Sequence, residues 1–443
     1  MRIQLSDHFT YGKLFRFAIP SVIMMVFSSI YGVVDGLFVS NIVGKTEFAA
    51  VNLIMPIMMI IGAIGFMMGA GGTAIVAKTL GEKQNELANK YFSLFVYVTF
   101  IAGAVLAIVG AIFIRPLSAM LGAEGALLDA CELYGRIVIL AMPAFMLQNL
   151  FQSFFIVAEK PKLGLWVTVG AGVTNILLDA LLVAAFSFGL AGAAIATSIS
   201  QIVGGFVPII YFLRKNDSLL RLGKTKFYGM ALLKAATNGS SELMSNISAS
   251  IVTILYNNQL MRLAGENGIA AYGVIMYVGF IFIAMFIGFA VGTAPIVGYN
   301  FGAGNTDELK NLLKKSTIIN FGAGAVMTAL AFILAEPLSM FFIGYDSELL
   351  EMTVRGFRIF SLSFLLSGFC IYGSSFFTAL NNGLISAIIS FMRTLVYQML
   401  GILILPIFFE LDGVWYSMLL AEFLAFITNI VFIFAMRKRY NYM

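Results

Sequence analysis

Twelve long apolar stretches follow one another along this chain of 443 residues. A helix needs about 20 apolar residues to cross the hydrocarbon core of a bilayer. Inside lipid, every backbone N–H and C=O group must find its partner within the protein, and a helix achieves this within one segment. The sequence therefore predicts an all-α integral membrane protein with twelve transmembrane helices. We place them near residues 15–40, 49–77, 91–114, 130–157, 163–185, 190–213, 232–261, 269–299, 316–335, 352–379, 384–408 and 413–436.

The composition excludes a large soluble helical protein. Hydrophobic residues make up 60% of the chain and charged residues 11%, whereas soluble domains are about 25% charged. The only histidine, His8, precedes the first span, and the two cysteines, Cys131 and Cys370, lie far apart in apolar segments. We therefore expect no enzyme centre, disulfide framework, cofactor or nucleic-acid partner, and we expect the lipid bilayer to surround the protein.

The lysines and arginines predict how the chain is oriented. Twenty of the 27 fall in the N-terminal tail, in the even-numbered loops, in the linker 214–231 with its flanking residues, or in the C-terminal tail. Only three fall in the odd-numbered loops, and four lie within predicted spans. Because loops rich in Lys and Arg stay in the cytoplasm, we expect a multi-pass protein of the cell inner (cytoplasmic) membrane with both termini in the cytoplasm.

The two halves of the chain repeat each other at a nearly constant offset. A repeat of six spans enters the membrane in the same direction twice, so the halves are parallel repeats about an axis along the membrane normal. We expect two pseudo-two-fold-related six-helix lobes, 1–213 and 232–443, joined by a cytoplasmic linker, 214–231. The recurrence of Arg136 as Arg358 indicates an architectural role for both. The other matches are Pro116–Ser118 with Pro337–Ser339, Ser153–Phe155 with Ser375–Phe377, and Gly192 with Gly413.

Two aspartates lie deep within predicted spans of the first half. Asp35 is well inside the first span, and Asp179 is in the fifth, four residues after Asn175. Residues four apart share one helix face, so Asn175 and Asp179 present an amide and a carboxylate together. Such oxygens suit Na⁺, and a carboxyl pair suits H⁺; the alternative is that each Asp caps a broken helix or lies near the interface. The equivalent positions, near Thr253 and Gly401, carry no carboxylate, so we place any cation site in the first half.

Four other polar residues within predicted spans are less specific. Glu242, in the first turns of the seventh span, is either functional or interfacial. Gln152, one span before the Asn–Asp pair, either supports the cation site or bridges helices. Arg393 and Glu422, in the last two spans, are predicted to form a structural ion pair.

The chain resembles the multidrug and toxic compound extrusion (MATE) family along its whole length. Pro20 and Asp35 match the bending proline and essential aspartate of the family's first helix, and Asn175–Asp179 resembles its fifth-helix motif. Thr197 matches a hydroxyl of the sixth helix. The resemblance implies that Asp35, Asn175, Asp179 and Thr197 bind H⁺ or Na⁺, with the first three as metal ligands if the ion is Na⁺. Pro20, Gln152 and Glu242 are then substrate-cavity or gating residues, Glu242 echoing one of the C-lobe acids of another branch.

Together with this resemblance, which implies export of organic cations or amphipathic drugs, the sequence predicts an antiporter coupled to H⁺ or Na⁺ that works by alternating access between two lobes and is a monomer. Its partner would be a small molecule, with an organic cation as the favoured class. The alternative is a flippase of a lipid-linked precursor, which would favour a strongly cationic cavity. An intramembrane prenyl transferase would need clustered aspartates for Mg²⁺, and no loop contains them. A passive channel would not need two lobes.

Overall fold

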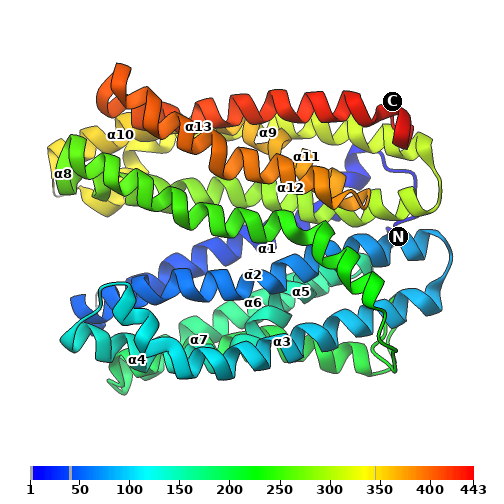
Figure 1. Ribbon diagram of the computed structural model, residues 1–443, viewed down its shortest axis with the longest axis horizontal. Coiled ribbons are helices and arrows are strands. Elements are labelled where there is room, and N and C mark those ends of the chain that lie inside the picture. The colour runs from blue at the N-terminus through cyan, green and yellow to red at the C-terminus, as the bar shows by residue number, and fades with distance from the viewer. Residues whose placement is uncertain (1–2, 39–41, 345) are drawn as a thin grey trace. The chain divides into compact units, whose positions relative to one another are not determined.

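The structure is a computed structural model that describes residues 3–38, 42–344 and 346–443. Over these ranges the chain is helical almost throughout and contains no strand. Figure 1 shows long helices that run alongside one another within each part of the molecule. The predicted all-α fold is confirmed.

The chain folds into two compact units, which we call unit 1 and unit 2. Unit 1 comprises Met1–Leu5 and Phe27–Gly239, and unit 2 comprises Ser6–Val26 and Ser240–Met443. The first helix, α1 (Tyr11–Phe38), is therefore divided between the units, and so is the long helix α8 (Gly229–Gly302). The predicted lobes, 1–213 and 232–443, assign these two stretches differently, and that functional partition stays a prediction.

Within the described residues, unit 1 is built from five long helical segments, the second part of α1 and the first part of α8. The segment of α4 and α5 bends by 53° between its two helices. A continuous core of buried apolar side chains, among them Ile54, Tyr134 and Ile139, joins α2, α3 and α4 to α5, η2 and α7. The elements are α1 (Tyr11–Phe38), α2 (Lys45–Gly81), α3 (Asn85–Met120), α4 (Gly125–Leu140), α5 (Met142–Val157), α6 (Pro161–Leu178), the π-helix η2 (Asp179–Ala185) and α7 (Gly189–Leu213).

Unit 2 repeats this plan. Its bent segment, α10 with α11, turns by 50°, and its core is centred on Tyr256, Phe286 and Trp415. The elements are α8 (Gly229–Gly302), α9 (Thr306–Ile343), α10 (Ser347–Ser361), α11 (Phe364–Ala379), α12 (Gly383–Phe391), the π-helix η3 (Met392–Val396) and α13 (Tyr397–Tyr440).

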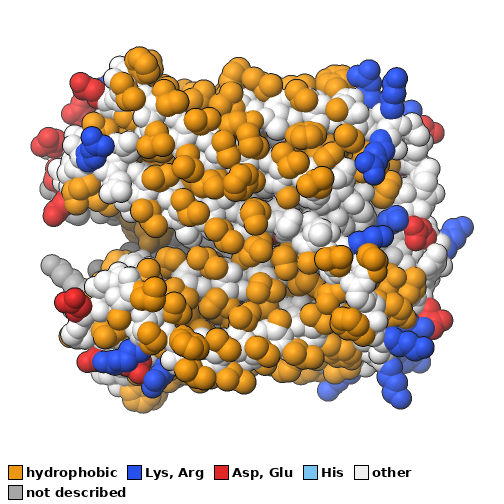
Figure 2. All heavy atoms as spheres, viewed as in Figure 1, with side chains coloured by type: hydrophobic (Ala, Val, Ile, Leu, Met, Phe, Trp, Pro, Cys, Tyr) orange, Lys and Arg blue, Asp and Glu red, His pale blue; other side chains and the backbone are white. Residues whose placement is uncertain are grey.

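The helices account for the twelve predicted spans. Eight helices in the described part of the chain are long and apolar enough to cross a membrane, and the two bent pairs raise the number to ten. Two of these ten contain two spans each, because the helical geometry is interrupted at Gly265 in α8 and at Glu410 in α13. The result is a multi-pass membrane protein with twelve spans. Figure 2 shows hydrophobic side chains over the middle of each unit and charged side chains at its ends.

Each unit contains a close helix contact formed by part of a helix that is divided between the units. In unit 1, a Cβ placed on Gly71 of α2 would lie 1.8 Å from the carbonyl oxygen of Ala235, and one on Gly239 would lie 1.8 Å from that of Met67. In unit 2, a Cβ on Gly288 would lie 2.5 Å from Cα of Val22 in α1. Small residues permit such backbone contact in membranes. These glycines are the reason that the divided helices can pack where they do.

The sequence repeat also determines where the two bent segments pack. Gly103 of α3 faces the bend of unit 1, where an added Cβ would lie 2.7 Å from Cα of Pro143. Its equivalent in the second repeat, Gly324 of α9, faces the bend of unit 2, where an added Cβ would lie 2.8 Å from the carbonyl oxygen of Phe364. Because glycine occupies the same position in each repeat, the bent segment of each unit can pack closely against the helix that carries it.

Candidate functional site

Asn175 and Asp179 lie at the junction of α6 and η2 in unit 1. Asn175 is 1% exposed and Asp179 is fully buried. The backbone N–H of Asp179 donates to the carbonyl oxygen of Asn175, which continues the helix into a π-helical turn that starts at Asp179. Single turns of π-helix are frequent at functional sites. As their spacing predicts, the two residues lie one turn apart within the same segment.

Thr197 lies on α7, which packs against both α6 and η2. The close approach of α7 to η2 depends on Gly192, because a Cβ there would lie 3.1 Å from the backbone carbonyl of Leu182 in η2. The hydroxyl of Thr197 is buried and has no hydrogen-bond partner among the described residues, and the same holds for the side-chain carbonyl oxygen of Gln201, one turn further on. Gln201 was not among the residues predicted from the sequence, although its spacing from Thr197 was a signal that could have found it.

The side chain of Asn175 is the most informative part of this region. Neither its amide nitrogen nor its oxygen has a hydrogen-bond partner within the described part of the chain. An unsatisfied buried polar group costs about 1–3 kcal/mol, and in a native structure it indicates an ion, a water or a catalytic or binding role. Amide, hydroxyl and carboxylate oxygens together are a donor set that fits a hard cation such as Na⁺.

Asp35 lies in the part of α1 that belongs to unit 1. Its side chain is outside the described structure, but the register of the helix places its backbone. Phe27 and Tyr31 pack on Gly172 of α6, where an added Cβ would lie 2.5 and 3.2 Å from their rings. Three spans separate α1 from α6, so the two helices run in the same direction. At about 1.5 Å per residue, Asp35 and Asp179 lie about 9 and 10 Å beyond this contact, at nearly the same level.

The other predicted residues are distributed over both units. Gln152 is buried in α5 of unit 1. Pro20 is buried within the part of α1 that belongs to unit 2. Glu242 lies in α8 of unit 2, half-buried, where its backbone carbonyl accepts a hydrogen bond from the side chain of Asn246. The structure therefore groups Asn175, Asp179 and Thr197 on adjoining helices of one unit and places Pro20 and Glu242 in the other.

The predicted ion pair between Arg393 and Glu422 is confirmed. Arg393 lies in η3 and Glu422 in α13, and their side chains are 14% and 1% exposed. Unit 2 thus carries a largely buried ion pair, whereas the corresponding region of unit 1 carries the Asn–Asp pair.

The sequence profile of the MatE family matches residues 20–181 and 243–404. The two matches cover corresponding stretches of the two repeats, and together they include most of the chain. The chain belongs to the MatE family. The first match begins at Pro20 and includes Asp35, Asn175 and Asp179, whereas Glu242 immediately precedes the second match and Thr197 lies between the two.

Comparisons with individual proteins also support membership of this family. The multidrug export protein MepA of Staphylococcus saprophyticus is 25% identical over 437 residues, which are 96% of this chain and 94% of MepA. A crystal structure of MATE in complex with MaL6 superposes with a TM-score of 0.92 at 23% identity, covering 97% of this chain and 98% of that one. The outward-facing conformation of a multidrug resistance MATE family transporter gives 0.91 at 23% identity, with 97% and 98% covered. At this identity the two structures show that the fold is shared.

Proposed function

We propose that this MatE protein is an antiporter that exports organic cations or amphipathic drugs in exchange for H⁺ or Na⁺. The name of its relative MepA, a multidrug export protein, supports drug export. The single observation that carries the coupling is the buried, unpartnered amide of Asn175 one turn before the buried carboxylate of Asp179. Thr197 on the adjoining helix α7 adds a hydroxyl, and Asp35 lies at the level of Asp179.

In this proposal the cation and the cargo favour different states of the protein. A ligand shifts a conformational equilibrium only by the difference between its affinities for the two states. Binding of H⁺ or Na⁺ at Asp35, Asn175, Asp179 and Thr197 would stabilise the state that releases cargo outside, by alternating access between the two lobes. Gln201 would supply a further carbonyl oxygen. Pro20, Gln152 and Glu242 are proposed to line the cargo path or to gate it.

The test is efflux of a fluorescent organic cation, such as ethidium, from proteoliposomes that carry either a Na⁺ gradient or a pH gradient. We expect one of the two gradients to drive efflux and Asp35→Asn or Asp179→Asn to abolish it. The matched control is Asp129→Asn, because Asp129 is exposed and paired with Arg115. Full gradient-driven efflux by the Asp35→Asn, Asp179→Asn double variant would overturn the cation-site assignment. Dependence on neither gradient would favour the flippase.

A further inference from the structure

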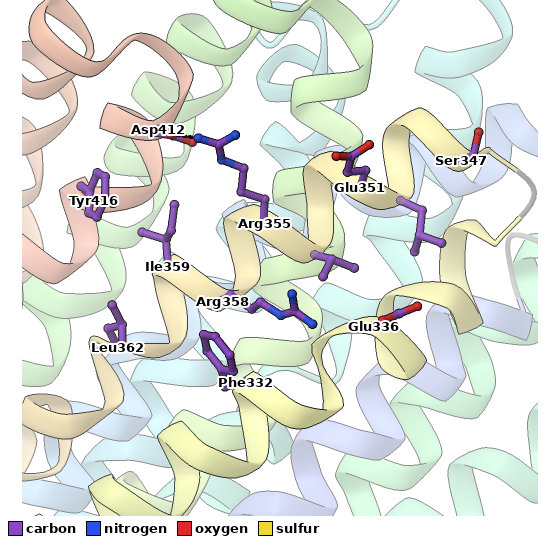
Figure 3. Close-up of a pocket in the computed structure, with 12 residues that line it drawn as sticks. Phe332, Glu336, Ser347, Glu351, Arg355, Arg358, Ile359, Leu362, Asp412 and Tyr416 are labelled. Carbon is purple, nitrogen blue, oxygen red and sulfur yellow. Dashed lines mark hydrogen bonds and ion pairs between the residues drawn. The ribbon is translucent and has the colours of Figure 1, made fainter.

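Unit 2 contains a cavity of about 600 Å³ that is separate from the residues assigned above. It is formed by α9, α10 and the part of α13 that follows the break at Glu410. Figure 3 shows the guanidinium of Arg358 extending beside the ring of Phe332, with Glu336 on the same helix as Phe332 and Glu351 about two turns before Arg358 on α10. The cavity combines charged groups of both signs with an apolar wall.

The repeat shows why Arg358 is unusual. In unit 1 the equivalent residue, Arg136, forms an ion pair with Glu132 at 2.7 Å, and Glu132 also binds Arg115. In the register that aligns Arg136 with Arg358, Glu132 is replaced by Val354. In the register that aligns Pro116 with Pro337, Arg115 is replaced by Glu336. The arginine recurs, but its carboxylate partner does not.

Arg358 consequently lacks a carboxylate partner within the described residues. Its guanidinium carbon lies 5.2 Å from the centre of the Phe332 ring, and its Nε is buried without a hydrogen-bond partner. The other arginine of the cavity, Arg355, is held by Asp412. A cation at membrane depth is costly unless it is paired. Arg358 therefore offers a site for an anion, and its planar fork suits a phosphate.

The two acidic residues of the cavity add the opposite charge. Glu336 and Glu351 form no ion pair in the part of the chain that the structure describes. Both are exposed and lie near the loop between α9 and α10. Carboxylates accept hydrogen bonds from an ammonium group with N–H donors. A ligand that satisfies the whole cavity carries a phosphate and, a few bonds away, such an ammonium.

The apolar wall indicates that this ligand is a lipid. Leu350, Val354 and Leu362 line the cavity, and helix α9, which also lines it, exposes Ile333 at 70% and Phe341 at 77%. In a membrane-spanning helix such side chains face acyl chains. We propose that the cavity binds the head group of an ethanolamine phospholipid, with the phosphate on Arg358, the ammonium at Glu336 and Glu351, and the acyl chains along α9. A choline head group has no N–H donor for the two carboxylates.

The test measures lipid binding to the purified full-length protein in the absence of any gradient, so that it is independent of transport. Native mass spectrometry would count bound lipids, and thermal unfolding would record stabilisation by phosphatidylethanolamine, phosphatidylcholine or phosphatidylglycerol. We expect phosphatidylethanolamine to bind best and Arg358→Gln to weaken its binding about tenfold, the loss of one charge-assisted contact. The matched control is Arg136→Gln, which removes the equivalent arginine of unit 1 and should leave lipid binding unchanged.

A second variant tests the ammonium half of the site. Glu336→Gln with Glu351→Gln should reduce the preference for phosphatidylethanolamine over phosphatidylglycerol several-fold, while Arg358 still holds the phosphate. Equal binding of phosphatidylethanolamine by Arg358→Gln and the unmodified protein would overturn the proposal, and so would equal binding of phosphatidylglycerol and phosphatidylethanolamine by the unmodified protein. Stabilisation by soluble phosphoethanolamine as large as that by the lipid would overturn the lipid assignment in favour of a site for a free zwitterion.

Discussion

The guanidinium of Arg393 donates three hydrogen bonds to the carboxylate of Glu422, at 2.6, 2.9 and 3.1 Å. The backbone carbonyl oxygen of Glu422 in turn accepts a hydrogen bond from the thiol of Cys370 at 3.5 Å. The pair thus ties the π-helical turn η3 to α13 and α11 inside unit 2. Two charges held in this bidentate geometry compensate each other, and either one alone would be an uncompensated charge in a buried site.

Breaking this pair should destabilise the protein strongly. We expect Glu422→Gln to lower the free energy of unfolding by about 3–5 kcal/mol, because it leaves Arg393 buried without its counter-charge. The double replacement Arg393→Met with Glu422→Leu removes both charges and should restore most of that stability. Thermal unfolding of the purified variants measures both effects. If Glu422→Gln were as stable as the unmodified protein, the pair would have no structural role.

The sequence was sufficient to predict the twelve spans, because lipid imposes both a minimum length and an apolar surface on each. It also predicted the Arg393–Glu422 pair, since two opposite charges within spans have few other ways to be satisfied. The π-helical turn after Asp179 could not be predicted, because an i to i+5 hydrogen bond is selected by packing against Gly192 and not by local sequence. The division of α1 and α8 between the two units depends on contacts at Gly71, Gly239 and Gly288 that an apolar pattern does not specify.

The recurrence of Arg136 as Arg358 led to a single architectural interpretation for both residues. In the structure the two arginines differ in their ion-pair partners, because Arg136 pairs with Glu132 and the residue of unit 2 that corresponds to Glu132 is Val354. The signal was present in the repeat, in the neighbours of the arginine and not in the arginine itself. A comparison of each matched residue together with the residue four positions before it would have found the difference.

The contact between Gly71 and Gly239 should not tolerate even a methyl group. Either Gly71→Ala or Gly239→Ala would place a Cβ 1.8 Å from a backbone carbonyl oxygen, so the helices must separate. We expect each variant to lose about 1–3 kcal/mol of stability through overpacking. The control is Gly170→Ala in α6, where no atom beyond the neighbouring residues and backbone of the same helix lies within 4 Å of the added Cβ. That change should be neutral or stabilising, since alanine favours a helix by about 1 kcal/mol. Thermal unfolding separates the two outcomes.

Asn175 should show opposite effects on stability and on transport. Asn175→Leu replaces two buried polar atoms that lack hydrogen bonds among the described residues, so we expect the free energy of unfolding to rise by about 1–3 kcal/mol. The same change removes a proposed cation ligand and should abolish gradient-driven efflux. The control is Asn320→Leu in α9, whose amide donates to the carbonyl oxygen of Ser316 at 2.8 Å. That variant should lose stability. An Asn175→Leu protein that is less stable yet fully active would contradict both expectations.

The N-terminal segment should depend on one acidic side chain of unit 2. Glu308 is 5% exposed; its carboxylate accepts hydrogen bonds from the backbone N–H of Phe9 at 3.0 Å and from Asn311 at 2.8 Å, and contacts His8 at 2.6 Å. The equivalent residue of the other repeat, Glu86, is 85% exposed and pairs only with Lys90 among the described residues. We expect Glu308→Ala to raise the rate of amide hydrogen exchange at Phe9 by about tenfold or more, because a charge-assisted bond contributes about 1.5–3 kcal/mol. Glu86→Ala is the matched control and should leave that rate unchanged. Equal protection of Phe9 in both variants would mean that packing of its buried ring, and not Glu308, holds the segment in place.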